Sequence, residues 1–235
     1  MKRAWVDRLL AGREARQPAL LLRWLESGDQ RLVDTPAEFA DLEASIGTLH
    51  EAASEALVSD RARVHDTPEG RVFVQPFNPP LRLAVIGAVH IAQHLVPMAR
   101  ATGYEVHVID PRSAFATAER FPGTVLSHEW PDRALEALGL DTRTAVVALS
   151  HDPKLDDPAL DAALASGAFY IGALGSRGNQ AKRVARLRER GYGDDALARI
   201  CGPIGLDIGA RSPAEIAVSI LAELTATLRR GPGSR

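Results

Sequence analysis

Two hydrophobic patterns follow one another along this chain, and each predicts a different kind of structure. Before about residue 78, short apolar runs are separated by turn residues, whereas after residue 80 continuous apolar runs alternate with segments of helical periodicity. The first pattern is typical of hairpins, and the second of a parallel sheet covered on both faces. We therefore predict an α/β protein with a small α+β N-terminal domain, residues 1–78, before a larger domain, residues 79–235.

The N-terminal pattern predicts two hairpins with a helix between them. Residues 19–33 read as two strands around the turn Ser27-Gly28-Asp29, because these residue types tolerate unusual backbone angles. Thr35 and Pro36 then predict the start of one amphipathic helix. Its apolar face comprises Phe39, Leu42, Ile46, Leu49 and Ala53. A second hairpin is predicted to turn at Pro68-Glu69-Gly70, and Asn78-Pro79-Pro80 is a stiff link that ends the domain.

The second pattern predicts five strands separated by helices. The strands read LRLAVIG, YEVHVID, TVLSH, TAVVALS and AFYIGALG. The helices are expected from about His90 to Ala101, near Arg133, near Ala159, from about Asn179 to Arg190, near Asp195 and from Pro213. The segment Ser212-Pro213-Ala214-Glu215 marks that last start well, since it combines a capping box with proline at the first helical position. The alternation is typical of a Rossmann-like parallel sheet with helices on both faces.

Composition and charge exclude several classes of partner. A net charge of -2, with 46% hydrophobic and 25% charged residues, gives no electrostatic reason to expect nucleic acid or an acidic membrane. The charged stretch MKRAWVDRLLAGREARQ has no apolar signal region, and no run approaches the roughly 18 apolar residues of a membrane span. We expect a cytoplasmic protein. Cys201 is the single cysteine, which excludes an intramolecular disulfide and a cysteine-based metal site, and we expect no resident metal.

The turn after the first strand of the larger domain resembles part of a dinucleotide-binding turn. Residues 87–93 read GAVHIAQ, so Gly87 and Ala92 fit the pattern G-x-G-x-x-A while Val89 replaces its second glycine. A valine side chain there intrudes on the path of a pyrophosphate and opposes the ordinary pose of NAD(P). The helix N-terminus still suits a phosphate, to which His90 could donate. The alternative is a surface histidine without a ligand role.

Other polar residues follow the later strands, at the edge where such sheets bind ligands. Asp110 stands at the spacing of an acid that binds a ribose hydroxyl, and Arg112 could pair with a phosphate, although Asp110 could equally only start a turn. His151 could act as an acid or base beside Asp152, but adjacent residues at a strand end usually point apart. The sequence therefore gives no dyad.

Two glycine-rich segments complete the candidate edge. Gly175-Ser176-Arg177 is a plausible anion cradle, with Lys182 also near it, whereas most of the later basic residues of that helix read as a solvated face. The loop over residues 202–211, which contains Gly205 and Asp207, is too apolar for a solvated linker. We predict that it folds back over the sheet edge, with Asp207 buried or facing the site. Cys201 before it reads as a small core residue.

Several of these segments resemble the C-terminal domain of the XdhC family. They are IGAVHIAQ, VIDPR, SHDPK, FYIGALGSRGNQAKR and, most specifically, PIGLDIGARSPAEIAVSILAE, which together cover nearly all of residues 81–228. The resemblance implies a domain that binds molybdenum cofactor and helps to deliver its sulfurated form to an apo-hydroxylase of the xanthine dehydrogenase type, working with a cysteine desulfurase. The cofactor-binding residues it implies are Gly87, His90, Asp110, Arg112, His151, Asp152, Gly175, Ser176, Arg177, Gly205 and Asp207.

The sequence departs from the family in two places. No segment like G-S-V-S-G-G-C-V-E precedes Pro80, which points to a separate partner protein that supplies this cysteine, and Val89 stands where other members have glycine. Since no catalytic set is compelling, the resemblance favours a cofactor-maturation chaperone over an enzyme. Two alternatives stay open: an NAD(P)-dependent oxidoreductase, and a non-catalytic interaction module with a decayed Rossmann site. The resemblance also leaves a homodimer open.

Overall fold

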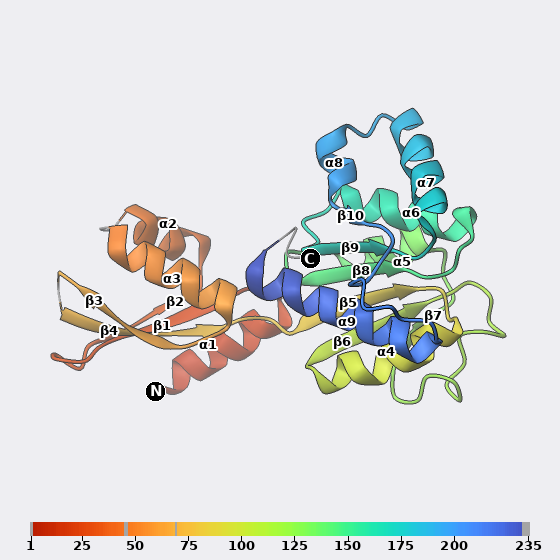
Figure 1. Ribbon diagram of the computed structural model, residues 1–235. Helices are drawn as coiled ribbons and strands as arrows, with labels where there is room; N and C mark the ends of the chain where they lie inside the picture. Colours follow the sequence, from red (N-terminus) through yellow and green to blue (C-terminus); the bar gives the residue numbers. More distant parts are fainter. Residues whose placement is uncertain (1, 45–46, 69, 232–235) are drawn as a thin grey trace. The chain divides into compact units, whose positions relative to one another are not determined.

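The computed structural model describes residues 2–44, 47–68 and 70–231. The chain divides into two compact units, Met1–Pro80 and Leu81–Arg235 (Figure 1). Each unit has its own hydrophobic core, and we describe each by itself. In the described residues, no helix combines the length and the apolar character needed to cross a bilayer.

The N-terminal unit is a small α+β structure, as predicted. Its elements are α1 (Arg3–Glu14), β1 (Ala19–Trp24), β2 (Gln30–Val33), α2 (Pro36–Ala44), α3 (Gly47–Ser59), β3 (Arg63–Thr67) and β4 (Gly70–Phe77). In the described residues the strands form one antiparallel sheet in the order β2-β1-β4-β3. Alternate side chains of the sheet, such as Leu20 and Leu22, are fully buried against Leu42 of α2 and Ala53 of α3.

The single helix predicted after Thr35 is wrong, because the structure has two helices, α2 and α3. The start is as predicted: the Thr35 hydroxyl accepts from the backbone N–H of Glu38, whose carboxylate accepts from the N–H of Thr35. Gly47, a poor helix former, is the first residue of α3. Two predicted positions, Ile46 on the apolar face and Glu69 in the second turn, lie outside the described residues.

The larger unit has the predicted Rossmann-like architecture. Its strands are β5 (Leu81–Ile86), β6 (Tyr104–Ile109), β7 (Val125–Ser127), β8 (Thr144–Ala148), β9 (Tyr170–Ala173) and β10 (Ile200–Cys201). Its helices are α4 (His90–Ala101), α5 (Pro131–Leu138), α6 (Pro153–Leu164), α7 (Arg177–Glu189), α8 (Asp194–Ala198) and α9 (Pro213–Arg230). Over the described residues the strands form a parallel sheet in the order β10-β9-β8-β5-β6-β7. β10, which the sequence did not predict, extends it beside β9.

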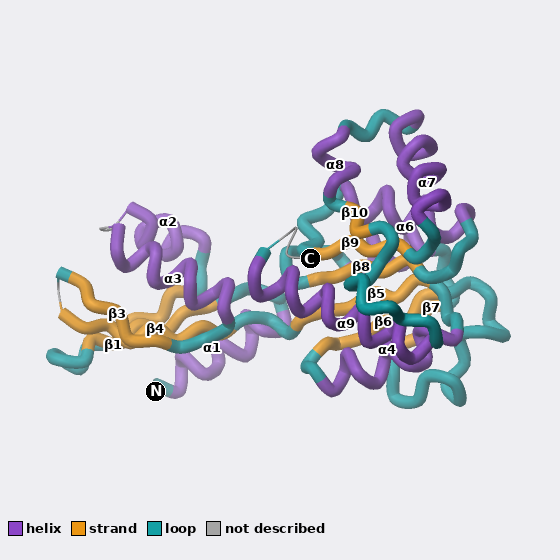
Figure 2. The backbone as a smooth tube through the Cα atoms, viewed as in Figure 1, coloured by secondary structure: helices purple, strands orange, loops and turns teal. Residues whose placement is uncertain are grey.

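Helices cover both faces of the parallel sheet, and Figure 2 shows them as separate layers around the strands. α4 and α9 pack on one face, where Leu83 and Val85 of β5 join their core cluster. α5 and α6 pack on the other face, where Ala84 and Ile86 of the same strand are buried. Every residue of β5, β8 and β9 is buried. This two-sided burial explains their continuous apolar sequences.

Candidate functional site

The candidate site lies at the carboxyl edge of the parallel sheet, beside β5 and β8. The chain runs from β5 to β6 and β7 on one side, and β8, β9 and β10 lie on the other. The strand order therefore reverses between β5 and β8, and open α/β sheets bind their ligands in the crevice beyond such a reversal. Gly87 follows β5 and Ser150 follows β8, so both flank this point.

The turn after β5 passes so close to the turn after β8 that position 87 must be glycine. Its φ angle is +100°, and a Cβ built on it would lie 2.9 Å from the backbone N and Cα atoms of Ser150. Backbone atoms cannot move aside as the end of a flexible side chain can. The glycine therefore lets the turns after β5 and β8 touch.

We expect Gly87→Ala to lower the free energy of unfolding by about 2–4 kcal/mol, because it adds the strain of a positive φ to a backbone clash. Gly103→Ala is the matched control: Gly103 has a φ of +93° but nothing within 4 Å of a built Cβ. Urea denaturation of both variants separates the two costs. Equal losses in the two variants would show that the contact with Ser150 is not tight.

Asp110 is fully buried and braces the turn after β5. Its Oδ2 accepts the backbone N–H of Ala88 at 2.8 Å, and both its oxygens accept from the Arg112 guanidinium, at 2.8 and 2.9 Å. Burial acts to raise the pKa of the Asp110 carboxyl, but the hydrogen bonds from Arg112 and Ala88 outweigh it and hold this pKa below its usual value. Both oxygens of Asp110 therefore accept hydrogen bonds within the protein. Its binding of a ligand stays a prediction.

A second network ties the turn after β8 to the turn after β9. The Ser150 hydroxyl donates to Asp156 Oδ1 at 2.6 Å and accepts from the backbone N–H of Asp152 at 3.1 Å. Asp156 Oδ2 lies 3.8 Å from Nη2 of Arg183, and that same Nη2 donates to the carbonyl of Leu174 at 2.8 Å. Both charged side chains are buried, and burial raises the pKa of the Asp156 carboxyl.

Sequence reasoning missed Asp156, and its assignment of the α7 basic residues to a solvated face is wrong for Arg183. Arg183 is only 4% exposed. One signal was available: Arg183 stands four residues before Leu187, which is also buried, so the two share one face of α7. The charge of Arg183 concealed that periodicity.

His151 and Asp152 occupy the turn between β8 and α6. His151 is exposed and has a φ of +61°, which is rare for a residue other than glycine. The Asp152 carboxylate caps α6 by accepting the backbone N–H of Lys154 at 2.9 Å. In the described structure no hydrogen bond joins these two side chains, and a ligand-site role for His151 stays a prediction.

The starts of α4 and α7 present exposed groups at this edge. His90 is the first residue of α4, and the preceding Val89 is half-buried against the core cluster. At α7, Gly175 has a φ of +146°, the Ser176 hydroxyl accepts the N–H of Asn179, and Arg177 is exposed. An anion could approach either helix start.

The loop over residues 202–211 folds back on the sheet, as predicted. Ile204 is buried, its N–H donates to the carbonyl of Ala173, and the N–H of Gly205 donates to Glu223 at 2.8 Å. Asp207 is exposed, so of the two predicted placements burial is wrong, and a position facing the site stays a prediction. The residues on either side of it make backbone hydrogen bonds, from Leu206 to Ser219 and from Ile208 to Leu206.

Hydrogen bonds and packing connect some of the predicted site residues to one another, whereas others make no such contact. Hydrogen bonds connect Asp110 and Arg112 to the β5 turn, and packing connects Gly87 to the Ser150 network, which includes the backbone of Asp152. Among the described residues, no hydrogen bond joins the side chains of His90, Arg177 or Asp207 to these networks. The part of the chain that the structure describes also holds no group of three His, Cys, Asp or Glu side chains suited to a metal ion.

A cavity of about 240 Å³ lies between β6, β7 and α5. It is lined mainly by apolar groups, from His107, Ile109, Val125, Ser127, Ala134, Ala137 and Leu138. None of the predicted site residues lines it. We therefore place the candidate site at the loops of the carboxyl edge rather than in this cavity.

Comparison with known proteins identifies relatives of this fold. The family model described as the XdhC Rossmann domain matches residues 83–224. Over 148 residues, or 63% of this chain, the sequence is 34% identical to the molybdenum cofactor insertion chaperone PaoD of Escherichia coli, of which it covers 40%. Over 195 residues, or 83% of this chain, it is 30% identical to a Bacillus subtilis protein named as a probable component of xanthine dehydrogenase, of which it covers 53%.

A solved structure shows the same fold. The crystal structure of a xanthine dehydrogenase from Bacillus halodurans matches 97% of this chain and 67% of that chain, with a TM-score of 0.70 and 24% sequence identity. At this level of identity the likeness establishes the fold alone. The chain spans about half or less of the length of the two curated relatives above, which are therefore larger proteins than this sequence.

Proposed function

Because the chain belongs to the XdhC family, whose Rossmann domain matches residues 83–224, we propose that it is an accessory protein that holds molybdenum cofactor for insertion into a molybdenum hydroxylase. The observation that carries this proposal is the 34% identity to PaoD, a protein named as a molybdenum cofactor insertion chaperone. The cofactor is cargo in this proposal, so the chain needs no catalytic residue of its own.

The carboxyl edge of the sheet supports the proposal, because it offers donors for an anionic cargo. The first backbone N–H groups of α4 carry the positive end of the helix dipole, and the preceding Val89 makes no side-chain cap. His90 and Arg177 are both exposed. A single phosphate on a bulky ring system could use these donors without the close pyrophosphate approach that Val89 obstructs.

The proposed role also involves the terminal sulfur of the cofactor and partner proteins. We propose that the chain receives the sulfurated cofactor by working with a cysteine desulfurase, and passes it to an apo-hydroxylase of the xanthine dehydrogenase type. A separate protein with the missing cysteine segment would complete the handling of molybdenum or sulfur. Cys201 is half-buried beside β9 and is assigned no part in this chemistry.

Binding of the cofactor by the purified protein tests the proposal. We expect it to bind molybdopterin, detected by fluorescence after oxidation of the pterin, and to show no nicotinamide absorbance as purified. If calorimetry shows saturable binding of NAD or NADP and none of molybdopterin, the oxidoreductase interpretation replaces ours. Binding of neither ligand would favour the interaction module.

Arg177→Ala should weaken binding of molybdopterin by about 1.5–3 kcal/mol, the usual contribution of a charge-assisted hydrogen bond, and leave the melting temperature nearly unchanged because Arg177 is exposed. Arg188→Ala is the matched control, since Arg188 lies on the same helix, is also exposed and pairs with Asp194. A titration of both variants with molybdopterin measures the difference. Normal binding by Arg177→Ala would remove this side chain from the site.

A further inference from the structure

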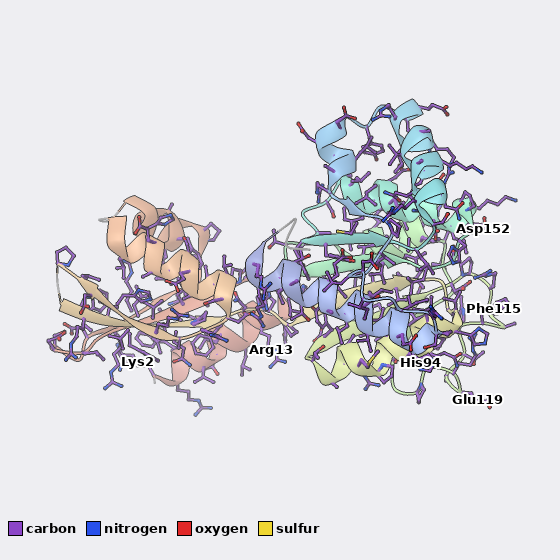
Figure 3. All side chains as sticks on the ribbon, in the orientation of Figure 1. Lys2, Arg13, His94, Phe115, Glu119 and Asp152 are labelled. Atoms are coloured by element: carbon purple, nitrogen blue, oxygen red, sulfur yellow. The ribbon has the colours of Figure 1, made fainter. Side chains whose placement is uncertain are left out.

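The loop between β6 and β7 presents an aromatic ring at the carboxyl edge of the sheet. Phe115 lies in this loop and remains 45% exposed, although phenylalanine is usually buried. Figure 3 shows Phe115 and Asp152 at the same end of the larger unit, the end at which the parallel strands finish. The exposed ring therefore belongs to the edge that carries the candidate site.

Two arginines fix this ring in place. The Arg112 guanidinium lies over the Phe115 ring, 4.6 Å from its centroid, while its nitrogen atoms bind the buried Asp110 carboxylate. Since Asp110 also accepts the N–H of Ala88, the ring is connected through two residues to the turn before α4. A side chain held in this way loses little further freedom when a ligand packs on it.

Arg120 adds a positive charge beside the ring. Its guanidinium lies 6.0 Å from the Phe115 centroid, donates to the carbonyl of Phe115, and donates to Gln93 of α4 at 3.1 Å. Within residues 2–44, 47–68 and 70–231, no acidic side chain pairs with Arg120. Its partners are neutral, so its charge remains available to an anion.

We propose that Phe115, with Arg112 and Arg120 against it, is a stacking platform for a flat, negatively charged heteroaromatic ligand. Such a ring gains contact area on the exposed part of Phe115 and attraction from Arg120. Arg112 and Asp110 connect the platform to the turn before α4, and the phosphate of the same ligand would bind at the start of that helix. The identity of the ligand ring as a pterin rests on the proposed function. The new element is the side chain that recognises this ring, Phe115.

The test compares ligands with and without a ring. Oxidised molybdopterin is the pterin probe, AMP is a purine with one phosphate, and glycerol 3-phosphate has a phosphate but no ring. Phe115→Leu should weaken binding of oxidised molybdopterin by about tenfold or more and leave glycerol 3-phosphate binding unchanged, since stacking alone is lost. Phe115→Tyr should bind like the parent. Trp130→Leu is the control, because Trp130 is an exposed aromatic residue on the neighbouring loop.

The outcomes separate the platform from the proposed function. If Phe115→Leu binds oxidised molybdopterin like the parent, or also loses glycerol 3-phosphate, the platform is overturned and the proposed function stands. If the parent binds AMP in a Phe115-dependent way but not oxidised molybdopterin, the platform stands and the proposed function fails. If the parent binds neither ring compound, both are overturned.

Discussion

A host strain without this chain is expected to make a molybdenum hydroxylase that is folded but inactive. The proposed role predicts that the hydroxylase polypeptides and their iron–sulfur and flavin groups persist, while the molybdenum cofactor is absent or lacks its terminal sulfur. The physical reason is that a sulfurated molybdenum centre is labile and must reach its buried site without meeting water, which a binding protein can exclude. Activity staining, together with metal and flavin analysis of the purified hydroxylase, measures the effect.

Two further measurements define this result. Chemical resulfuration of the purified hydroxylase should restore activity if only sulfur is missing, and should fail if the whole cofactor is missing. Complementation with the parent chain or with Arg188→Ala should restore activity, whereas Arg177→Ala should restore less. Full hydroxylase activity in the deletion strain, with no paralogue to substitute, would rule out the maturation role.

Arg183→Met should lower the free energy of unfolding by about 3–5 kcal/mol at neutral pH. The substitution removes the cation that pairs with the buried Asp156 carboxylate at 3.8 Å and so weakens the compensation of this buried charge. It also removes the hydrogen bond to the carbonyl of Leu174, which connects the β9 turn to α7, and the hydrogen bond to Gln180 within α7. Urea denaturation followed by circular dichroism measures the loss.

The loss should depend on pH, with a sign that follows from Asp156. Burial raises the pKa of this carboxyl, so the folded state binds its proton more tightly than the unfolded state, whose pKa is about 3.9. Stability therefore falls as the pH rises from the unfolded to the folded pKa. Arg183 lowers the pKa of Asp156, so Arg183→Met widens this range, and its loss relative to the parent should be smaller at pH 4 than at pH 8.

A double variant controls this experiment. Asp156→Asn keeps the shape of the side chain without the charge, so Arg183→Met with Asp156→Asn should recover part of the stability at pH 8 and lose the pH dependence of the difference. An equal loss for Arg183→Met at both pH values would show that the pair contributes through packing and not through charge.

The sequence predicts most of the larger unit because its signals are local. Continuous apolar runs identify β5, β8 and β9, and the capping box at Ser212 identifies the start of α9. The elements that were missed lack such signals. β10 has only two residues, and α1 has no fully buried residue, since Trp5, Val6 and Leu9 on its apolar face are only half-buried, so both signals are weak.

The sequence predicted the edge of the sheet at which the candidate site lies, but not the side-chain contacts within it. Parallel strands deliver their carboxyl ends to one edge, so residues such as Gly87 and Asp110 could be assigned to it from the strand pattern alone. The Asp156–Arg183 pair was missed because charged residues in amphipathic helices usually face solvent, and the spacing of Arg183 and Leu187 was the one signal against that. The orientation of Phe115 could not be predicted, since contacts with Arg112 and Arg120 determine it rather than any local pattern.

The packing of α9 on α4 also sets when the larger unit can be completed during synthesis. Ala217, Ile220 and Leu224 of α9 are fully buried in the cluster that covers one face of β5. Until residue 224 leaves the ribosome, α9 cannot complete the cover of this face, and of these two helices only α4, which ends at Ala101, is available to pack on it. We therefore expect the unfinished polypeptide to present an apolar surface through a long stretch of elongation. A protein that we propose to shelter a cofactor thus itself requires shelter while it is being made.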